Sequence, residues 1–397
     1  MNIEQTERLR ILLHNEDIKN VRMGLELCDA LLLEASAVVD LFCLKGISDS
    51  KRLSESQKAY PHGRHLYGWI LCKLLELGVS WVTELKSLDL RGCGLSALPE
   101  HVLQHRSLEG IDLSFNALNV PPDLSGLSRL KWLHLFGNPL NIPTILPTLD
   151  AIGLDVEDCL LSVSDVPSGR FIMGALLKDE LAWAWETPRH EVVISKDMRV
   201  MRLPVTQWLY ELVMGHNPSE FQGLDRPVET VSWYDAVSFA NALSIRFDLS
   251  PAYEINGASV VCHFQSNGWR LPTEAEREYL ARGGESHLFA GNDDVDSVAW
   301  YSDNSGGESA AVGDKTANAF GLYDMSGNVN EWCWDWFGDY SSDSETDPQG
   351  PSRGSNRVIR GGSWFHAASL SRSSFRHGRD PSLSYSDVGF RLVRSSN

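Results

Sequence analysis

The sequence predicts a multidomain α+β protein: an N-terminal helical module, a short repeat array of the α/β solenoid type and a loop-rich C-terminal domain. Three observations indicate this architecture. The chain has 397 residues, which is too long for one ordinary hydrophobic core. Leucines recur with a fixed period in residues 81–158. Ten of the 13 tryptophans lie in residues 161–394, where glycines and short turns multiply.

Residues 1–80 are predicted to form the helical module. In DIKNVRMGLELCDALLLEASAVVDLF, apolar side chains fall three or four positions apart, on one helical face. These positions are Ile18, Val21, Leu25, Cys28 and Leu32. A second predicted helix, HLYGWILCKLLELG, ends at a glycine that suits a helix C-cap.

Residues 81–158 contain three copies of one pattern, LKSLDLRGCGL, LEGIDLSFNAL and LKWLHLFGNPL. The copies begin at Leu85, Leu108 and Leu130, a spacing of 23 and then 22 residues, which is typical of leucine-rich repeats. Between the strand and the turn of each repeat lies a residue whose side chain is expected to hydrogen-bond the turn backbone. In the three copies this residue is Cys93, Asn116 and Asn138. Three copies are about the minimum for a continuous core, so LPTLDAIGLDVEDC is the predicted cap.

A short leucine-rich array is either a surface for protein contacts or a spacer. The strand positions expected on its concave face are Lys86, Ser87, Asp89, Glu109, Asp112, Lys131, Trp132 and His134. Trp132, with His134 beside it, is the candidate anchor for a protein partner, because aromatic side chains dominate interface energetics. Packing of Trp132 against a neighbouring domain is the alternative.

Charge and cysteine content restrict the function classes. The formal net charge is −18, and such a surface repels phosphate backbones, so no nucleic-acid partner is expected. The seven cysteines are scattered without a CxxC pair, which indicates reduced thiols and a cytoplasmic protein. The most apolar window, LLLEASAVVDLF, is too short to cross a bilayer, so no membrane association is expected.

Two helices are predicted in the third zone. One is VTQWLYELVMG. The other is PTEAEREYLARGG, which begins with Pro272 and Thr273, carries acidic residues in its first turn and closes with glycines. The remainder of the zone is predicted to consist of short strands bounded by Gly, Asp, Asn and Pro.

Residues 161–394 also carry a dense, collinear set of motifs: VPSGRFIMG, ETPRHEVVIS, PVTQWLYELVMGHNPSEF, RPVETVSWYDAVSFANAL, GWRLPTEAEREYLARGG, AWYSDNSGG, NAFGLYDMSGNVNEWCWDW, RVIRGGSW and VGFRLV. With these motifs the zone resembles the formylglycine-generating enzyme (sulfatase-modifying factor) family, whose fold is a variant of the C-type lectin fold. The resemblance implies a C-type-lectin-like domain at the C-terminus.

The resemblance does not carry the family's oxidation of a substrate cysteine. Oxygen-using members hold copper with two cysteines that follow the GGS motif, and soft thiolates suit Cu(I). The matching positions here are His366 and Ser371, and residues 358–397 contain no cysteine. We therefore expect no copper and no catalytic residue of that kind.

A structural calcium ion is the cofactor that the resemblance does imply. Its matching ligands are Asp324, Gly327, Val329 and Glu331, whose oxygen atoms suit a hard cation. The alternative is that Asp324 and Glu331 only cap tight turns. Asn330 and Arg277 stand where the family usually has tryptophan, so both depart from the pattern.

The segment RVIRGGSWFHAASLSRSSFRHGRDPSLSYSDVGFRLVR needs another explanation. Arg360 to Trp364 and Gly389 to Arg391 keep the family's residues, which frame a hairpin. Between them, a mixture of aromatic, small and polar side chains is predicted to face solvent and bind a ligand, as in an antibody paratope. The candidate ligand-binding residues are Trp364, Phe365, His366, Ala367, Ser369, Leu370, Ser371, Phe375, His377, Leu383, Ser384, Tyr385 and Asp387.

The architecture also looks like that of variable proteins from diversity-generating retroelements, in which adenines are rewritten in the codons of a C-terminal segment. Phe, His, Ala, Ser, Leu, Tyr, Asp and Gly are all reachable from adenine-rich asparagine codons. This resemblance implies a diversified segment.

Together these features predict a bacterial, cytoplasmic, non-catalytic recognition protein. Its C-terminal domain binds a protein or other macromolecular ligand, and its repeats contact a protein partner. The first alternative is a divergent enzyme of the same family that acts on a peptide or small molecule without the two-cysteine copper site. The second is a purely structural module.

Overall fold

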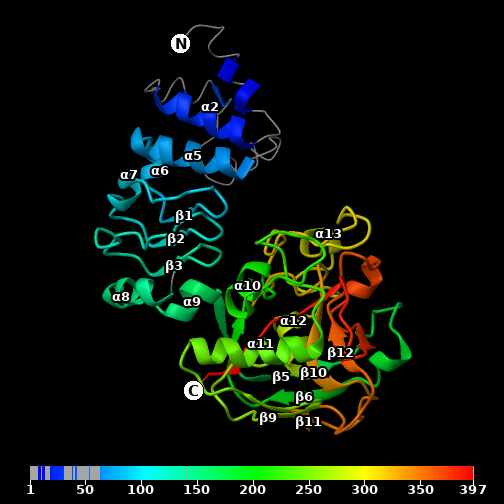
Figure 1. Cartoon of the computed structure of the whole chain (residues 1–397). Coiled ribbons are helices and arrows are strands. Elements are labelled where there is room, and N and C mark those ends of the chain that lie inside the picture. Colours follow the sequence, from blue (N-terminus) through cyan, green and yellow to red (C-terminus); the bar gives the residue numbers. More distant parts are fainter. Residues whose placement is uncertain are drawn as a thin grey trace. The chain divides into compact units, whose positions relative to one another are not determined.

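The protein forms two compact units, Met1–Leu161 and Ser162–Asn397, in the computed structural model (Figure 1). The structure describes residues 8, 9, 11–13, 18–30, 38, 41, 42, 53, 63–140 and 142–396. The predicted helical module and repeat array both belong to the first unit. The predicted lectin-like domain corresponds to the second unit.

The first unit combines short helices with three very short strands. In chain order its elements are α2 (Ile18–Ala30), α5 (Gly63–Glu76), α6 (Ser80–Thr83), β1 (Ser87–Asp89), α7 (Glu100–Leu103), β2 (Gly110–Asp112), β3 (Trp132–His134), α8 (Ile142–Ile152) and α9 (Val156–Leu161). Helix α2 buries Val21, Leu25 and Cys28, as their spacing predicts. Leu32, also predicted on that face, lies outside the described residues.

Helix α5 ends where the sequence predicts a C-cap. Gly78 has φ 69°, a left-handed conformation that glycine adopts without steric cost. Its N–H donates to Leu75 O, and the N–H of Val79 donates to Leu74 O, which is the pattern of a Schellman motif. Within the described ranges, no helix is long and apolar enough to cross a membrane.

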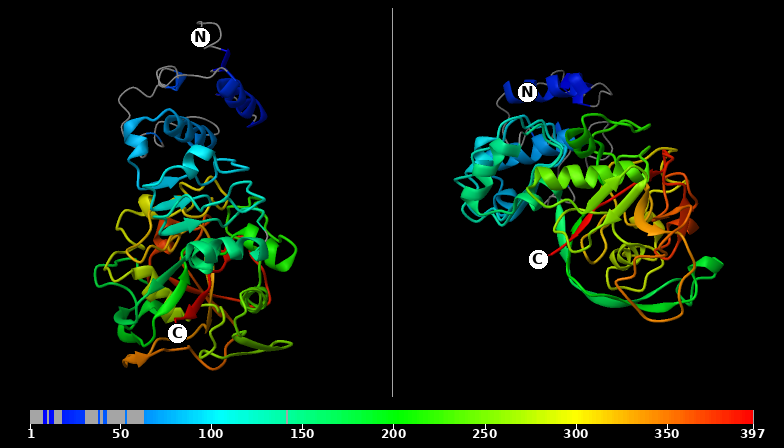
Figure 2. Two further views of the ribbon diagram at one scale, coloured as in Figure 1. Left: turned by 90° about the vertical axis from the view of Figure 1, so that its left-hand side faces the viewer. Right: turned by 60° about the horizontal axis from the view of Figure 1, so that its bottom comes forward.

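The three repeat strands form a parallel sheet in the order β1-β2-β3, and Figure 2 shows them stacked in two further views. Leu88, Ile111 and Leu133 lie opposite one another in register, and all three are buried. The central leucines of successive repeats therefore share one core, as the repeat pattern predicts.

Two buried asparagines connect successive repeats. Asn116 donates from Nδ2 to Leu90 O at 2.8 Å and accepts from the N–H of Leu95 at 3.0 Å. Asn138 repeats the arrangement one turn later, with Nδ2 2.8 Å from Leu113 O and Oδ1 3.0 Å from the N–H of Leu118. The predicted asparagine ladder is confirmed.

The second unit contains many short strands, four α-helices and two 3-10 turns among its described residues. In chain order the elements are β4 (Val163–Val166), β5 (Gly169–Met173), η1 (Ala184–Glu186), β6 (His190–Ile194), β7 (Met198–Met201), α10 (Gln207–Met214), α11 (Trp233–Arg246), β8 (Tyr253–Asn256), β9 (Ser259–Cys262), α12 (Glu274–Arg282), α13 (Val295–Val298), β10 (Asn330–Trp336), β11 (Glu345–Thr346), β12 (Arg357–Arg360), η2 (Ala368–Ser371), β13 (Arg376–Arg379), β14 (Val388–Gly389) and β15 (Val393–Ser395).

Both helices predicted in this zone are present, as α10 and α12. Thr273 caps the N-terminus of α12 in a reciprocal capping box with Glu276, and Gly283 closes the helix with φ 60°. The 14-residue helix α11 was not predicted. Its N-terminal signal was present, since Ser232 and Asp235 also form a capping box.

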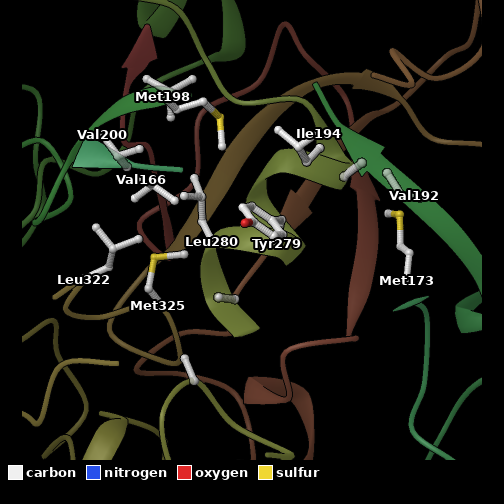
Figure 3. Close-up of a cluster of buried hydrophobic side chains, with 14 residues drawn as sticks. Val166, Met173, Val192, Ile194, Met198, Val200, Tyr279, Leu280, Leu322 and Met325 are labelled. Carbon is white, nitrogen blue, oxygen red and sulfur yellow. The ribbon is translucent and has the colours of Figure 1, made fainter. Parts of the chain in front are cut away.

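The core of the second unit lies around helix α12. Figure 3 shows Tyr279 and Leu280 of α12 surrounded by side chains from strands β4 to β7 and from the loop that precedes β10. The residues of this cluster are Val166, Met173, Val192, Ile194, Met198, Val200, Ala275, Tyr279, Leu280, Ala281, Ala290, Leu322, Met325 and Val393. Helix α12 is thereby held rigidly, and its remaining side chains can anchor other elements.

Candidate recognition surface

The C-terminal segment folds as the hairpin that its framing motifs predict. Strands β12 and β13 pair antiparallel, and β14 returns parallel to β10. The chain reverses at Gly361 and Gly362, which have φ 104° and 75°. A Cβ on Gly362 would lie 2.6 Å from Ser371 Oγ and 2.7 Å from Leu370 O, so the loop approaches too closely for any other residue.

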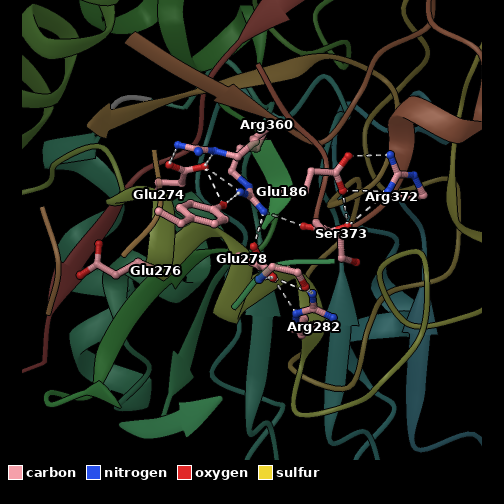
Figure 4. A network of polar contacts seen from close by, with 12 residues as sticks. Glu186, Glu274, Glu276, Glu278, Arg282, Arg360, Arg372 and Ser373 are labelled. Atoms are coloured by element: carbon pink, nitrogen blue, oxygen red, sulfur yellow. Dashed lines mark hydrogen bonds and ion pairs between the residues drawn. The ribbon is translucent and has the colours of Figure 1, made fainter. Parts of the chain in front are cut away.

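Two buried arginines attach this hairpin to helix α12, and Figure 4 shows one of them, Arg360, with Glu274 and Glu278 of the helix. Arg376 donates two hydrogen bonds of 2.6 Å to the Glu274 carboxylate. Arg360 donates to Glu274 at 2.8 Å and to Glu278 at 2.5 Å. Burial alone would raise the pKa of Glu274, but Arg376 and Arg360 hold that pKa below its usual range. The hairpin is therefore attached to the core by charged pairs that are not available to a ligand.

A third arginine ties down the loop between the two strands. Arg372 binds Glu186 with two parallel hydrogen bonds of 2.8 Å and also pairs with Asp179. Ser374 Oγ donates to the same Glu186 carboxylate at 2.8 Å. Bidentate arginine–carboxylate pairs fix geometry as well as energy, so this loop has a defined path.

The structure divides the candidate ligand-binding residues by exposure. The exposed ones are Phe365, Ala367, His377, Leu383 and Ser384, and the half-buried ones are Trp364, His366, Ser369, Leu370 and Tyr385. Phe365 and Leu383 are 65% and 51% exposed, which is unusual for large apolar side chains. The expectation of solvent-facing positions is wrong for Ser371, Phe375 and Asp387, which are buried.

The reason for these three exceptions is tertiary packing. Phe375 is 3% exposed and its ring lies 6.1 Å from that of Trp183, centroid to centroid. Ser371 is 0% exposed and lies beneath the turn at Gly362. Asp387 accepts a hydrogen bond from Asn330 Nδ2 at 3.1 Å. The partners of Phe375 and Asp387 lie outside the segment, so its local sequence does not indicate these contacts.

A polar cluster lies beneath the exposed residues. His366 Nδ1 is 3.2 Å from Ser363 Oγ, and His366 Nε2 is 3.7 Å from Asp387 Oδ2. Asn330 is fully buried next to both, and its Oδ1 has no hydrogen-bond partner. Burial lowers the pKa of His366 although the charge of Asp387 opposes the shift, so His366 is mainly neutral at pH 7.

Other parts of the unit support the aromatic residues of the segment. The rings of Phe221 and Trp364 pack edge to face at 4.9 Å between centroids, and Phe365 follows at 5.5 Å from Trp364. Ser305 Oγ donates to Trp364 O, and the N–H of Ser302 donates to His366 O, each at 2.9 Å. Sequence reasoning missed Phe221 because it lies more than 140 positions earlier, with no local signal that links it to the hairpin.

The two positions that match the copper-binding cysteines lie in different surroundings. His366 belongs to the polar cluster with Asp387, whereas Ser371 is buried under the glycine turn. The segment contains none of the six cysteines that lie in the described part of the chain. Burial raises the pKa of Cys333 far above its usual value, so its thiol is unreactive at neutral pH.

The residues that the resemblance assigns to calcium are Asp324, Gly327, Val329 and Glu331. Both carboxylate oxygens of Glu331 accept hydrogen bonds from guanidinium groups, at 2.7 Å from Arg277 and at 2.7 to 2.9 Å from Arg391. Asp324 is 2% exposed and accepts from the N–H of Gly313 at 2.7 Å. Across the described ranges, no three His, Cys, Asp or Glu side chains gather in a group that could hold a metal ion. The donor set therefore fits calcium poorly.

The repeat unit places its two candidate contact residues side by side. The rings of Trp132 and His134 lie 5.1 Å apart, and Phe136 continues the row 5.9 Å from His134. The Trp132 ring lies over Gly110 of the neighbouring strand, where a Cβ would come within 1.9 Å of it. Both candidates are half-buried, and His134 Nδ1 is 3.6 Å from Asp112 Oδ2.

Comparisons with known proteins assign both units to families. A model described as the sulfatase-modifying factor enzyme 1-like domain matches residues 159–396, and a leucine-rich repeat model matches residues 83–140. The chaperone protein LppX of Paenibacillus barcinonensis is 35% identical over 238 residues, which are 51% of this chain and 82% of LppX.

Two further relatives are similar over the second unit. The formylglycine-generating enzyme of Streptomyces coelicolor is 31% identical over 193 residues, which are 44% of this chain and 54% of that enzyme. The chain thus spans about half the length of that enzyme. Among solved structures, variable protein 1 of Treponema denticola is 35% identical, with a TM-score of 0.55 over 59% of this chain and 95% of that chain. Since the family model covers more than half of the sequence, the chain belongs to the sulfatase-modifying factor enzyme 1-like family, here joined to leucine-rich repeats.

Proposed function

We propose that the C-terminal unit is a non-catalytic recognition module, which binds a protein or other macromolecular ligand through the outward side chains of residues 364–385. One observation carries the proposal. A single segment has buried arginines on its inner face and exposed apolar side chains, led by Phe365 and Leu383, on its outer face. The arginines of the inner face maintain the fold, so the side chains of the outer face are available to contact a ligand.

The chemistry of the outer face suits macromolecular recognition. Large rings supply contact area at a low entropic cost, and hydroxyl groups supply adaptable hydrogen bonds. Trp364 is half-buried and braced by Phe221, so it presents a preorganised edge next to the exposed ring of Phe365. Preorganised aromatic groups reduce the ordering cost of binding.

We further propose that the outer residues are diversified between copies of the gene. The similarity to a protein named as variable supports this idea. So does the geometry, because a change at Ala367, His377 or Ser384 alters an exposed side chain and leaves every arginine pair intact. In the first unit, the half-buried aromatic row of Trp132 and His134 is the proposed contact for a protein partner.

The test of diversification is sequencing of the 3′ end of the gene across a population of source cells. We expect substitutions at the codons of exposed residues such as Phe365 and Leu383, and none at those of Arg360, Arg372 and Arg376. An invariant segment, or changes that fall equally on the arginine codons, would contradict diversification.

The test of binding is site-specific photo-crosslinking of the full chain in a source-cell extract. A crosslinker at position 365 should give one dominant, saturable adduct that excess unlabelled protein competes away. The matched control is position 177, because Leu177 is 91% exposed but lies outside the segment. Equal adducts at both positions, or none at 365, would refute a recognition surface there.

A divergent enzyme remains the second candidate, and the buried cluster of His366, Asp387 and Asn330 is the observation that favours it. Incubation with cysteine-containing peptides and copper, followed by mass spectrometry, tests this candidate. We expect no oxidised product, since no thiolate lies in the segment. Conversion of the cysteine with loss on His366→Ala would instead establish catalysis.

A further inference from the structure

Arg277 occupies an unusual place in the core of the second unit. It projects from helix α12, is 1% exposed, and donates from Nε to Glu331 Oε2 at 2.7 Å. Its Nη2 donates to Met325 O at 3.0 Å. One guanidinium group therefore joins α12 to β10 and to the tight turn that precedes this strand.

The turn is held from its other side by Arg391. This arginine grips both oxygens of Glu331 and donates from Nη2 to Tyr323 O at 2.7 Å. Two backbone carbonyl groups that flank Asp324, those of Tyr323 and Met325, thus accept from guanidinium groups. The carboxylate of Glu331, which both guanidinium groups bond, is one of the oxygen ligands that the resemblance assigns to calcium.

The buried charges already balance without a metal ion. Arg277 and Arg391 both bond the Glu331 carboxylate, Asp324 adds a second carboxylate, and all four side chains are buried. Asp324 lies within electrostatic reach of Arg391. A divalent cation added here would leave surplus positive charge in a low-dielectric core, which is strongly unfavourable.

The backbone also provides space for the guanidinium group. Gly361 has φ 104°, and a Cβ at this position would lie 3.0 Å from Arg277 Nη2. A larger residue at 361 would press on the arginine. The turn, the strand and the hairpin are thus all shaped around this side chain.

We propose that the Arg277 guanidinium takes the place of a structural calcium ion, so that the second unit folds and holds its hairpin without divalent cations. The positive charge is built into the chain, at a position where the related enzymes carry tryptophan. The inference is independent of what the outer face binds.

The wild-type protein gives the first test. Isothermal titration of the metal-free full chain with calcium chloride should show no stoichiometric binding, and melting curves in EDTA and in millimolar calcium should coincide. A ligand present far above its dissociation constant raises the melting temperature of a folded protein, so a bound ion would be visible. Single-site calcium binding, or a lower melting temperature in EDTA, would overturn the proposal.

Arg277→Met gives the second test. We expect a lower melting temperature, because Glu331 loses one partner, and partial recovery in millimolar calcium but not in millimolar magnesium. The matched control is Arg270→Met, which breaks the buried pair with Glu276 away from the turn and should show no recovery. A folded Arg277→Met protein that calcium does not stabilise, or equal recovery in both variants, would refute the replacement. Should the variant not fold, the wild-type titration still decides the question.

Discussion

The two units stabilise irregular backbone with different chemistry. In the repeat unit, the neutral amides of Asn116 and Asn138 bond backbone groups of adjacent turns. In the second unit, arginine–carboxylate pairs such as Arg376 with Glu274 join segments that are about a hundred residues apart. A neutral ladder serves a periodic structure, where the partner is always one repeat away. Long charged side chains serve a fold in which partners lie far apart in sequence.

Acid should produce the largest difference in stability between the two units. Burial alone would raise the pKa of Glu274 and of Glu331, but the neighbouring arginines hold both pKa values below 4.5, their usual value. A group whose folded pKa is depressed stabilises the fold above its unfolded pKa, and this stability is lost as the pH falls through the folded pKa. The free energy of unfolding of the second unit should therefore drop steeply below about pH 4.5.

Urea unfolding followed by tryptophan fluorescence at a series of pH values measures this drop, since ten of the 13 tryptophans lie in the second unit. Asp324 acts in the opposite direction: burial raises its pKa to about 6, so its protonation between pH 6 and its usual 3.8 favours the folded state. A stability that stays constant or rises from about pH 4.5 to pH 3 would contradict the role of the charged pairs.

Arg376→Ala should strongly destabilise the second unit. It leaves the buried Glu274 carboxylate with one arginine fewer, and breaking a buried ion pair costs about 3 to 5 kcal/mol. Chemical denaturation measures the loss. The matched control is the exposed Arg353, whose replacement by alanine should change stability by less than about 0.5 kcal/mol. Similar effects for both variants would show that the pair is not an anchor.

Asn138→Ala tests the neutral ladder. It removes the buried hydrogen bonds of the Asn138 amide with Leu113 O, Leu135 O and the N–H of Leu118, so we expect a loss of about 1 to 3 kcal/mol, confined to the repeat unit. Hydrogen exchange resolved by peptide detects where the loss falls. Asn119, which is exposed, provides the control. A loss that spreads into the second unit would mean that the ladder is not local.

Phe365→Ala should have the smallest effect on stability, below about 0.5 kcal/mol, because the ring is 65% exposed. Phe375→Ala, in the same segment, removes a buried ring and should cost about 3 to 5 kcal/mol. Thermal melts of the two variants measure the difference. Comparable destabilisation would show that Phe365 is structural and would remove it from the recognition surface.

Local signals predicted the elements whose causes are local. The glycines after α5 and α12 adopt the left-handed conformation that the C-cap prediction requires. The leucine period predicted the register of Leu88, Ile111 and Leu133. Helix α11 is not among the predicted helices, although the capping box of Ser232 and Asp235 is readable in the sequence.

Predictions that depended on distant partners were less complete. The sequence predicts a solvent-facing Asp387, yet the side chain is buried against Asn330, more than fifty positions away. In the sequence Arg277 is a departure from the family pattern, and only the structure shows that its guanidinium bonds Met325 O and Glu331. A single sequence does not state which buried carboxylate an arginine will reach.

The sequence by itself determined the repeat array, the family of the second unit and the absence of thiolates in the C-terminal segment, because these depend on spacing and on residue identity. Only the tertiary structure decided which residues of that segment face outward and which are anchored. Anchoring depends on the location of Glu186, Glu274 and Glu278 in space, and long-range packing sets that location.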